Sequence, residues 1–360
     1  MDVEEVISVI NQAALKEASE LDLSGLGLRS VPPQVWNLAN LTFLDLGHNE
    51  LTALPSEIGY LTNLTGLVLA DNQLIGLPPE IVKLTQLDLL SLSDNHLAAL
   101  APEMFDLANL TYLNLSGNQL TKLPPEIVQL AQLRILSLGH NPLTALPPEI
   151  FKFPDLEELH LGAAIITRLP PEIGNLTSLR YLSLARNQLT DLPPEIGKLT
   201  RLTILSLYGN QLTGLPPEIG NLTWLESLSL DSNQLTVLPP EIGSLARLTD
   251  MSLDSNLLTE LPPEIGELAG LESLSLGNNR LTAIPKSMVK LEKLSQGRSS
   301  IRVVGQFVSD GRVVCNLGPP SSLTPKGLDL SHNLLTILPP EINQLREEWG
   351  IDLSGNPLIR

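Results

Sequence analysis

The residues of this chain that could carry out chemistry recur at a fixed interval and do not gather at one point. A glutamate follows two prolines in most copies of the segment P-P-E-I, the five histidines fall in different copies, and Cys315 is the only cysteine. Acid–base catalysis and metal binding need two or more such groups at short range. His48 and His140, for example, stand four copies apart. The sequence therefore predicts no catalytic residue, no metal site and no cofactor.

Other residue types in the chain are suited to binding a protein. Tyrosine and arginine are enriched among the residues that dominate protein interfaces. Aromatic residues make up only 3% of this chain, yet several fall at matching positions of consecutive copies. The predicted protein-binding residues are Tyr112, Arg134, Ile135, His160, Arg180, Tyr181, Arg186, Ile204, Tyr208, Asp231 and Asp254. A surface that simply varies from copy to copy would also expose scattered apolar residues, so this alternative stays open.

A repeat of 23 residues positions these candidates. The stretch LTILSLYGNQLTGLPPEIGNLTW (residues 202–224) is followed directly by LESLSLDSNQLTVLPPEIGSLAR (residues 225–247). An asparagine marks each copy, at Asn49, Asn72, Asn95, Asn118, Asn141, Asn187, Asn210, Asn233, Asn256 and Asn279. Ala164 stands where the series predicts one more. Two later copies carry Asn333 and Asn356, and the segment LDLSGLGL (residues 21–28) opens the series.

The spacing within one copy predicts a strand, a bend and a tight return. In L-x-L the two leucines point to one side of a strand and the residue between them points to the other. The asparagine side chain can bond the backbone at the bend, and stacked asparagines can form a ladder between copies. The paired prolines exclude a strand or a regular helix, which favours a short helical turn. A single copy buries too few side chains to offset its conformational entropy, so stability must come from stacking.

The pattern L-x-x-L-x-L-x-x-N-x-L-x-x-L-P-P-E-I-G resembles the leucine-rich repeat family over residues 20–294 and 326–360. The resemblance implies an α/β repeat fold, namely a solenoid (horseshoe) with a concave parallel β-sheet and short helical or irregular convex turns. The L-P-P-E-I-G type of repeat is similar to bacterial intracellular repeat proteins. It is also similar to the repeat region of Roco GTPases and to the Ras-suppressor and plant Ras-group repeat proteins. The predicted protein-binding residues would then lie on the concave face.

For function, the resemblance implies a non-catalytic, cytoplasmic scaffold that recognises a protein partner and is linked to signalling by small GTPases. In Roco proteins a GTPase module follows the repeats, and repeat-bearing bacterial ubiquitin-ligase effectors carry a catalytic module with a cysteine motif. Neither module is found in this sequence. One alternative stays open. The chain would be the substrate-recognition arm of an enzyme, of GTPase or ubiquitin-ligase type, whose catalytic module is missing from it.

The composition narrows the class of partner. The net charge of −18 disfavours nucleic acid and anionic membranes as partners. A lone cysteine allows no disulfide within the chain and favours a reducing compartment. The start, MDVEEVISVI, lacks the basic region of a signal peptide, and no run of about 18 apolar residues is present for a membrane span. The sequence thus predicts a cytoplasmic protein with a protein partner, and it leaves the oligomeric state open.

The repeat also predicts how the chain is divided. Residues 1–19 are expected to form an N-terminal capping helix. Its apolar face consists of Val3, Val6, Ile7, Ile10 and Ala14, and Asp2 with Glu5 fits a capping box. Residues 20–294 carry the leucine-rich repeats, and residues 295–325 form an irregular insertion. Residues 326–360 hold the last two repeats, with the C-terminus uncapped.

Two places break the repeat. In the insertion, IRVVGQFV and RVVCNL flank the turn-like SDG, and six basic residues against two acidic ones fall between residues 286 and 312. Three interpretations stay open: a projecting β-hairpin, two decayed repeats that still pack, or a flexible loop. The other break is Ala163 with Ala164. It forms either a shallow recess in the binding face or a tolerated lapse that costs about 1 kcal/mol of lost hydrogen bonding.

Overall fold

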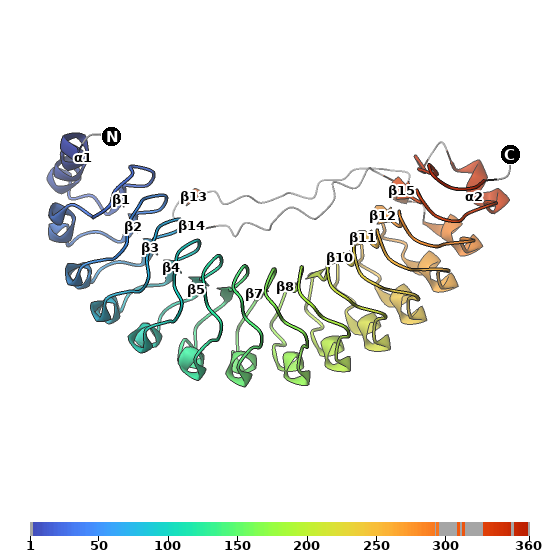
Figure 1. Cartoon of the computed structure of the whole chain (residues 1–360), viewed down its shortest axis with the longest axis horizontal. Coiled ribbons are helices and arrows are strands. Elements are labelled where there is room, and N and C mark those ends of the chain that lie inside the picture. The colour runs from blue at the N-terminus through green and yellow to red at the C-terminus, as the bar shows by residue number, and fades with distance from the viewer. Residues whose placement is uncertain are drawn as a thin grey trace. The chain divides into compact units, whose positions relative to one another are not determined.

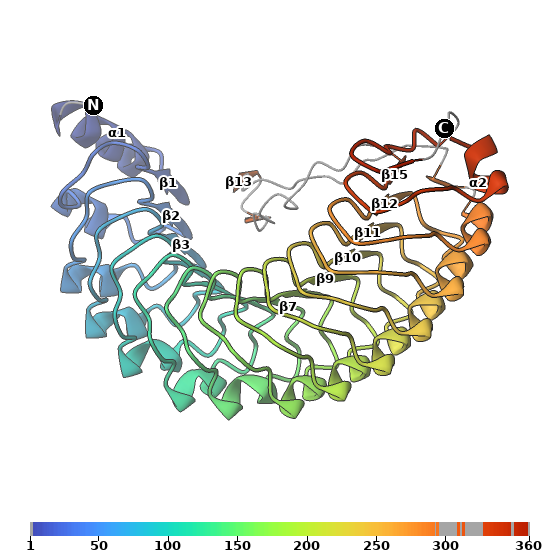
Figure 2. The same ribbon diagram turned by 45° about the vertical axis from the view of Figure 1, so that its right-hand side comes forward.

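The computed structural model describes residues 3–291, 293–294, 308–309, 312–313, 327–346 and 349–358. The chain forms two compact units, Met1–Ala164 and Ile165–Arg360. In each unit, short parallel strands line one side and short helical turns line the other (Figure 1, Figure 2). Each unit is therefore a solenoid of the kind that the repeat predicts, and the predicted fold class is confirmed.

The strands of the first unit follow one another in chain order. They are β1 (Glu20–Asp22), β2 (Phe43–Asp45), β3 (Gly66–Val68), β4 (Leu89–Ser91), β5 (Tyr112–Asn114), β6 (Ile135–Ser137) and β7 (Glu158–His160). Each strand pairs in parallel with the next one along the chain. Paired residues stand one repeat apart, as Leu44 and Leu67 do. Every copy of the repeat therefore adds one strand in the same register.

The second unit repeats this arrangement. Its strands are β8 (Tyr181–Ser183), β9 (Ile204–Ser206), β10 (Ser227–Ser229), β11 (Asp250–Ser252), β12 (Ser273–Ser275) and β15 (Gly327–Asp329). They too pair in parallel and in chain order. β12 pairs with β15, with Leu274 opposite Leu328, so the register is kept across the residues between them. The repeat after β15 contributes a single bridge, between Asp329 and Asp352, in place of a strand.

Turns of 3-10 helix return the chain from one strand to the next. In the first unit they are η1 (Pro33–Asn37), η2 (Ser56–Tyr60), η3 (Pro79–Lys83), η4 (Pro102–Asp106), η5 (Pro125–Gln129) and η6 (Pro148–Lys152). In the second they are η7 (Pro171–Asn175), η8 (Pro194–Lys198), η9 (Pro217–Asn221), η10 (Pro240–Ser244), η11 (Pro263–Glu267) and η12 (Lys286–Lys290), followed by the short α-helix α2 (Pro340–Gln344). The tight helical return that the prolines predict is thus confirmed.

The paired prolines explain why these turns form. The first proline is extended, as Pro193 is with φ −68° and ψ 146°, and the second occupies the first helical position. Proline suits that position because its missing N–H has no partner there in any helix. At the other end, the amide of Leu199 donates to the carbonyl of Ile196 at 3.1 Å. That bond closes the turn and directs the chain toward the next strand.

The leucines and isoleucines of the repeat form the core. Leu90 of β4 and Ile81 of η3 are fully buried in the first unit, as are Leu205 of β9 and Ile196 of η8 in the second. Full burial of such a side chain contributes about 1.5–3 kcal/mol. Since the strand and the turn of one copy bury their residues against the same copy and its neighbours, each unit is stabilised along its whole length.

The helix α1 (Val3–Leu15) covers the first repeat and contacts η1. Val6 and Ile10 are 1% exposed, which agrees with the apolar face that the sequence predicts. Ala14, however, is exposed, so this face ends about one turn earlier than expected. Asp2, the first residue of the predicted capping box, lies outside the described residues.

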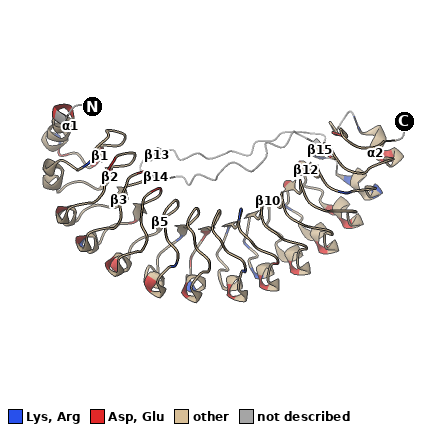
Figure 3. Ribbon diagram, viewed as in Figure 1, with Lys and Arg blue, Asp and Glu red and all other residues tan. Residues whose placement is uncertain are grey.

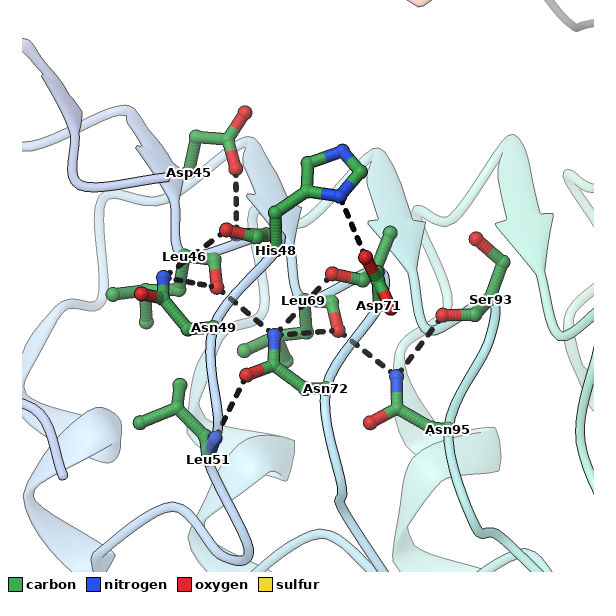
Figure 4. Close-up of polar contacts among 12 residues, drawn as sticks. Asp45, Leu46, His48, Asn49, Leu51, Leu69, Asp71, Asn72, Ser93 and Asn95 are labelled. Atoms are coloured by element: carbon green, nitrogen blue, oxygen red, sulfur yellow. Dashed lines mark hydrogen bonds and ion pairs between the residues drawn. The ribbon is translucent and has the colours of Figure 1, made fainter. Parts of the chain in front are cut away.

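The recurring asparagine joins each repeat to its neighbours. Nδ2 of Asn72 donates to the carbonyls of Leu46 at 2.9 Å and Leu69 at 3.2 Å. Its Oδ1 accepts a hydrogen bond from the amide of Leu51 at 2.9 Å. Asn95 makes the equivalent bonds one repeat later (Figure 4). The second unit contains the same bonds, so the asparagine ladder predicted from the sequence is confirmed in both units.

Ala164 interrupts the asparagine ladder in the first unit. The amide of Leu120 donates to Oδ1 of Asn141 at 3.0 Å, as the ladder requires. One repeat later the amide of Leu143 has no asparagine to reach, and it donates to the carbonyl of Asn141 at 2.8 Å instead. Ala164 itself is buried. Because the local backbone satisfies the amide, the structure supports the interpretation of Ala164 as a tolerated lapse.

A short stretch of the insertion falls within the described residues. β13 (Val308–Ser309) pairs antiparallel with β14 (Arg312–Val313), with Val308 opposite Val313. The remainder of the insertion, including Cys315, lies outside the described residues. The domain boundaries drawn from the sequence and the three interpretations of the insertion stay predictions.

Candidate functional site

The residues predicted to bind a protein are divided between the two units. The first unit holds Tyr112, Arg134, Ile135 and His160, and the second holds Arg180, Tyr181, Arg186, Ile204, Tyr208, Asp231 and Asp254. All of them lie in a strand or within three residues of one. Each unit therefore presents its own group on the strand side.

In the first unit, large side chains at one repeat position form an apolar stripe, which consists of Phe43, Leu89, Tyr112 and Ile135. Leu89 pairs with Tyr112, and Tyr112 pairs with Ile135. Gly66 holds the same position in β3, and a Cβ there would lie 2.5 Å from Cδ2 of the Phe43 ring. The ring therefore lies over Gly66, and the missing side chain makes room for it.

Polar residues next to the apolar stripe are buried as well. Ser91, Asn114 and Ser137 lie two positions further along their strands and are at most 7% exposed. The hydroxyl of Ser91 has no hydrogen-bond partner within the described residues. Tyr112 is itself only 6% exposed. On this face Tyr112 is thus part of the packing of the fold and offers little surface to a partner.

Arg134 and His160 each meet a carboxylate of the first unit. Nη1 of Arg134 lies 3.0 Å from Oε1 of Glu157, and the Arg134 side chain is 61% exposed. Nε2 of His160 lies 3.1 Å from Oε2 of Glu158, two residues earlier in β7, and the His160 side chain is 13% exposed. Arg134 therefore presents its charge at the surface, whereas His160 is mostly covered.

In the second unit, aromatic and arginine side chains come together on the strand side. Tyr181 pairs with Ile204, and both are partly exposed. The guanidinium of Arg186 lies over the ring of Tyr208, 5.4 Å from the ring centroid. This is a cation–π distance, which holds both side chains in one orientation. Arg180 is exposed at the start of β8.

Asp231 and Asp254 have hydrogen-bond partners inside the second unit. Together with Ser229, Ser252 and Ser275 they form an acidic row. The hydroxyl of Ser275 donates to Asp254 at 2.6 Å, and the hydroxyl of Ser252 donates to Asp231. Asp231 also accepts the amide of Asp254 at 3.1 Å and is 6% exposed. The sequence placed these carboxylates at an open surface, and it missed that serines one repeat later bind them.

The pKa of Asp254 lies above the ordinary value of an aspartate. Burial raises it, the hydrogen bond from Ser275 opposes the rise, and the negative charge of Asp231 adds to it. Burial likewise raises the pKa of Asp250. The acidic row therefore brings carboxylates into a place where their charged forms are disfavoured, and serine hydroxyls compensate only part of that cost.

A further group, which the sequence analysis missed, stands in the turns that lead into the strands of the second unit. Trp224 is 47% exposed, whereas Trp36 and Trp349 are 6% and 3% exposed. The guanidinium of Arg247 lies 4.3 Å from the centroid of the Trp224 ring. Arg201, Trp224 and Arg247 hold the same position in three consecutive repeats. An alignment of that repeat position, and not only of the strand positions, would have revealed them.

Titratable side chains are spread along both units. Nδ1 of His48 lies 2.8 Å from Oδ2 of Asp71, for example, and acidic residues recur on the helical turns (Figure 3, Figure 4). Among the residues that the structure describes, no group of three or more histidine, cysteine, aspartate or glutamate side chains is arranged to hold a metal ion. In the same residues no helix has the length and the apolar character that crossing a membrane requires.

Comparison with family models identifies the repeat over most of the chain. A model described as a leucine-rich repeat region matches residues 100–180 and 171–257. Two models described as leucine rich repeat match residues 246–296 and 40–61. A comparison with curated proteins found no match.

Solved structures of several organisms are similar to this chain. A leucine-rich repeat protein of Leptospira interrogans is 35% identical, with a TM-score of 0.73, and the match covers 97% of this chain and 93% of that one. The plant peptide hormone receptor RGFR1 in complex with RGF2 is 28% identical, with a TM-score of 0.68, over 95% of this chain and 56% of the receptor chain. An internalin of Listeria monocytogenes shares the fold at 22% identity and a TM-score of 0.75, over 95% of this chain and 88% of the internalin.

Proposed function

The chain belongs to the leucine-rich repeat family, and on that premise we propose that it is a non-catalytic scaffold that binds a protein partner on the strand side of its repeats. Proteins of this fold generally act as protein-binding scaffolds. One similar structure is a plant peptide hormone receptor in complex with RGF2. The binding role is carried over to this chain because its strand side presents side chains of the types that bind proteins.

One observation carries the proposal: the stacking of Arg186 on Tyr208 beside the paired Tyr181 and Ile204. These side chains are partly exposed and held by contacts within the unit. Because these side chains are already ordered, they lose little conformational entropy when a partner binds, and this favours affinity. Aromatic and arginine residues with such support are the types that dominate protein interfaces.

The other predicted residues have two different roles in this proposal. Arg134, Ile135 and Arg180 are partly or fully exposed and would contact the partner directly. The more deeply buried residues would instead hold the strand side in shape, and they are Tyr112, His160, Asp231 and Asp254. A matched test can separate these roles, because loss of a contact residue weakens binding while lowering stability less than loss of a buried residue does.

The experiment is affinity capture with the double variant Tyr181→Ala and Tyr208→Ala. The wild-type chain is expected to enrich a partner from a native lysate, and the double variant is expected to lose at least about 90% of it, or more than 1.4 kcal/mol. The control is Val237→Ala with Tyr60→Ala, which removes two exposed apolar side chains away from the strand side. Unchanged capture by the double variant, with normal thermal unfolding, would contradict the proposed face.

We also propose that the partner belongs to small-GTPase signalling and that the chain acts in the cytoplasm. The support is the similarity of the L-P-P-E-I-G repeat to the Roco and Ras-suppressor repeats, and the presence of a single cysteine. Purified small GTPases loaded with GDP or with a GTP analogue should bind the wild-type chain and not the double variant. Absence of binding in both nucleotide states would remove this part of the proposal.

The alternative proposal is that the chain is the substrate-recognition arm of an enzyme of GTPase or ubiquitin-ligase type, whose catalytic module is missing from it. The same strand side would then hold the substrate. Sequencing the surrounding gene decides between the two, because a catalytic module in the same reading frame favours the alternative.

A further inference from the structure

We infer that three turns of the second unit form a docking surface for an acidic, extended segment of a partner protein, and that this surface consists of other residues than the proposed binding site on the strand side. The surface consists of Arg201, Trp224 and Arg247 and is called the turn patch. These residues precede β9, β10 and β11, where the chain passes from a helical turn into a strand. The inference rests on rigidity, charge, exposure and spacing.

Buried leucines on both sides hold the turn patch in place. Leu222 and Leu225 flank Trp224 and are 0% exposed, and the amide of Leu225 donates to the carbonyl of Leu222 at 2.9 Å. The turn before β11 is built in the same way, with Leu248 donating to Leu245 at 3.0 Å. The exposed residue of each turn therefore projects from a fixed backbone.

Among the described residues, the arginines of the turn patch have no acidic partner. Within the part of the chain that the structure describes, neither Arg201 nor Arg247 forms an ion pair, in contrast to Arg134 and Lys290. In the three turn segments 199–203, 222–226 and 245–249, Glu226 is the only acidic residue. Two guanidinium groups thus remain free to bind carboxylates on a chain whose net charge is −18.

Trp224 adds an apolar contact between the two charges. It keeps 47% of its surface exposed, unlike the two buried tryptophans. Arg247 already lies over one face of the ring at 4.3 Å, which fixes the orientation of the ring. A bound segment could cover the rest of the ring without further ordering of the patch. Tryptophan and arginine in this arrangement are typical of the centre of a protein interface.

The spacing of the patch indicates the form of its ligand. Neighbouring strands lie about 4.8 Å apart, so Arg201 and Arg247, two strands apart, stand roughly 10 Å from each other. An extended peptide in the polyproline II conformation advances about 3.1 Å per residue and has three residues per turn. Carboxylates three residues apart therefore lie on one face of such a peptide and span about the same length. We therefore expect an extended segment with two carboxylates three residues apart and an apolar side chain between them. Nucleic acid fits less well, because two arginines cannot offset the repulsion of the acidic chain along a polyphosphate.

The test uses the full chain and three fluorescein-labelled probes. The acidic peptide is ELGDELGDELGD, the neutral peptide is QLGNQLGNQLGN, and the third probe is an oligothymidylate of twelve nucleotides. Fluorescence anisotropy should show binding of the acidic peptide at least about tenfold tighter than of the other two probes. Because the other tryptophans are buried, unlabelled acidic peptide should also shift the tryptophan emission, and Trp224→Ala should remove that shift.

Matched variants test whether the acidic peptide binds at the turn patch. Arg201→Glu with Arg247→Glu should weaken acidic-peptide binding at least about tenfold, and Trp224→Phe should keep more of it than Trp224→Ala. The control, Arg168→Glu with Arg280→Glu, changes the net charge equally at two other exposed arginines and should leave binding unchanged. Equal loss in the control, equal binding of the neutral peptide, no binding of the acidic peptide, or tighter binding of the oligothymidylate would each overturn the inference.

Discussion

The strand sides of the two units are built on the same backbone but differ in what they present. In the first unit the apolar stripe packs side by side, and Tyr112 within it is 6% exposed. In the second unit Tyr181 holds the same repeat position and is partly exposed, and the acidic row follows it along the strands. The comparison teaches that the recurring leucines and asparagines build the solenoid, while a few variable positions decide whether a side chain on the strand side is buried or exposed.

The largest expected effect is a loss of stability on removal of an asparagine of the ladder, and it should be equal in the two units. Asn95→Ala in the first unit and Asn233→Ala in the second should each lower the free energy of unfolding by about 3 kcal/mol, because each leaves a buried leucine amide unpaired and removes the hydrogen bonds from the asparagine side chain to neighbouring carbonyls. Urea unfolding measures the loss. The exposed Gln73→Ala is the control. A loss of stability in one unit and none in the other would contradict an equal contribution of the asparagine ladder to both units.

The next effect separates packing from presentation at one repeat position. Tyr112→Ala should cost about 2–3 kcal/mol, because its ring is buried, and Tyr181→Ala should cost about 1 kcal/mol. Thermal unfolding of both variants compares them directly, and Tyr60→Ala, at 62% exposure, should be close to neutral. If Tyr181→Ala were the more damaging change, the contrast between the two faces would be wrong.

A third change tests the apolar stripe itself. Gly66→Ala should destabilise the first unit by about 1–2 kcal/mol, since the new methyl group meets the Phe43 ring. Ser227→Ala changes the same repeat position in the second unit and should have little effect. Adding Phe43→Ala to Gly66→Ala should remove the clash, so the two changes together should cost less than their sum. Strict additivity of the two changes would show that the ring does not lie over Gly66.

The smallest effect concerns the acidic row and appears as a dependence on pH. The pKa of Asp254 is raised in the folded state, so the folded chain binds that proton more tightly than the unfolded chain. Its contribution to stability is present below the ordinary value of 3.8 and is lost as the pH rises through the raised pKa. Asp254→Asn should therefore gain stability relative to wild type as the pH rises over that window, measured by thermal unfolding.

Asp352 supplies a control of opposite sign for the pH experiment. The backbone amide and the hydroxyl of Ser354 bond its carboxylate and lower its pKa. Its stabilising contribution is therefore present above the ordinary pKa and is lost as the pH falls through the lowered value. Asp352→Asn should lose stability relative to wild type as the pH rises. Parallel curves for the two variants would contradict the assigned pKa directions.

The strand register and the helical turns could be predicted from the sequence, because the repeat determines them. Hydrogen bonds between variable residues of different copies could not be predicted. The period places Leu44 opposite Leu67, and paired prolines explain why η8 is a 3-10 helix. Those features follow from the consensus of the repeat and its period of 23 residues. The bond from Ser275 to Asp254 depends on two variable residues that stand 21 positions apart, which no single copy reveals.

The candidate site shows the same division between what is periodic and what is not. The exposure of Tyr181 and Tyr208 could be predicted because they lie in a strand or two residues after one, where the repeat marks the positions that do not face the core. The burial of Tyr112 depends on its neighbours Leu89 and Ile135 being large, and the stacking of Arg247 on Trp224 lies at a turn position. Residue type and period indicate where a side chain stands, whereas its exposure depends on what the adjacent copies contribute.

The asparagine ladder also determines how such a protein can change in length over evolution. Each asparagine takes its partners from its own copy and the one before, so whole copies of 23 residues can be gained or lost by recombination with every bond preserved. A stretch of any other length has to leave the ladder and rejoin it. Asn333 is an example, since it follows Asn279 by 54 positions instead of 23. It nevertheless accepts a hydrogen bond from the amide of Leu281 at 3.0 Å and donates one to the carbonyl of Leu276 at 2.9 Å. These are the bonds that the asparagine of a directly following copy would make.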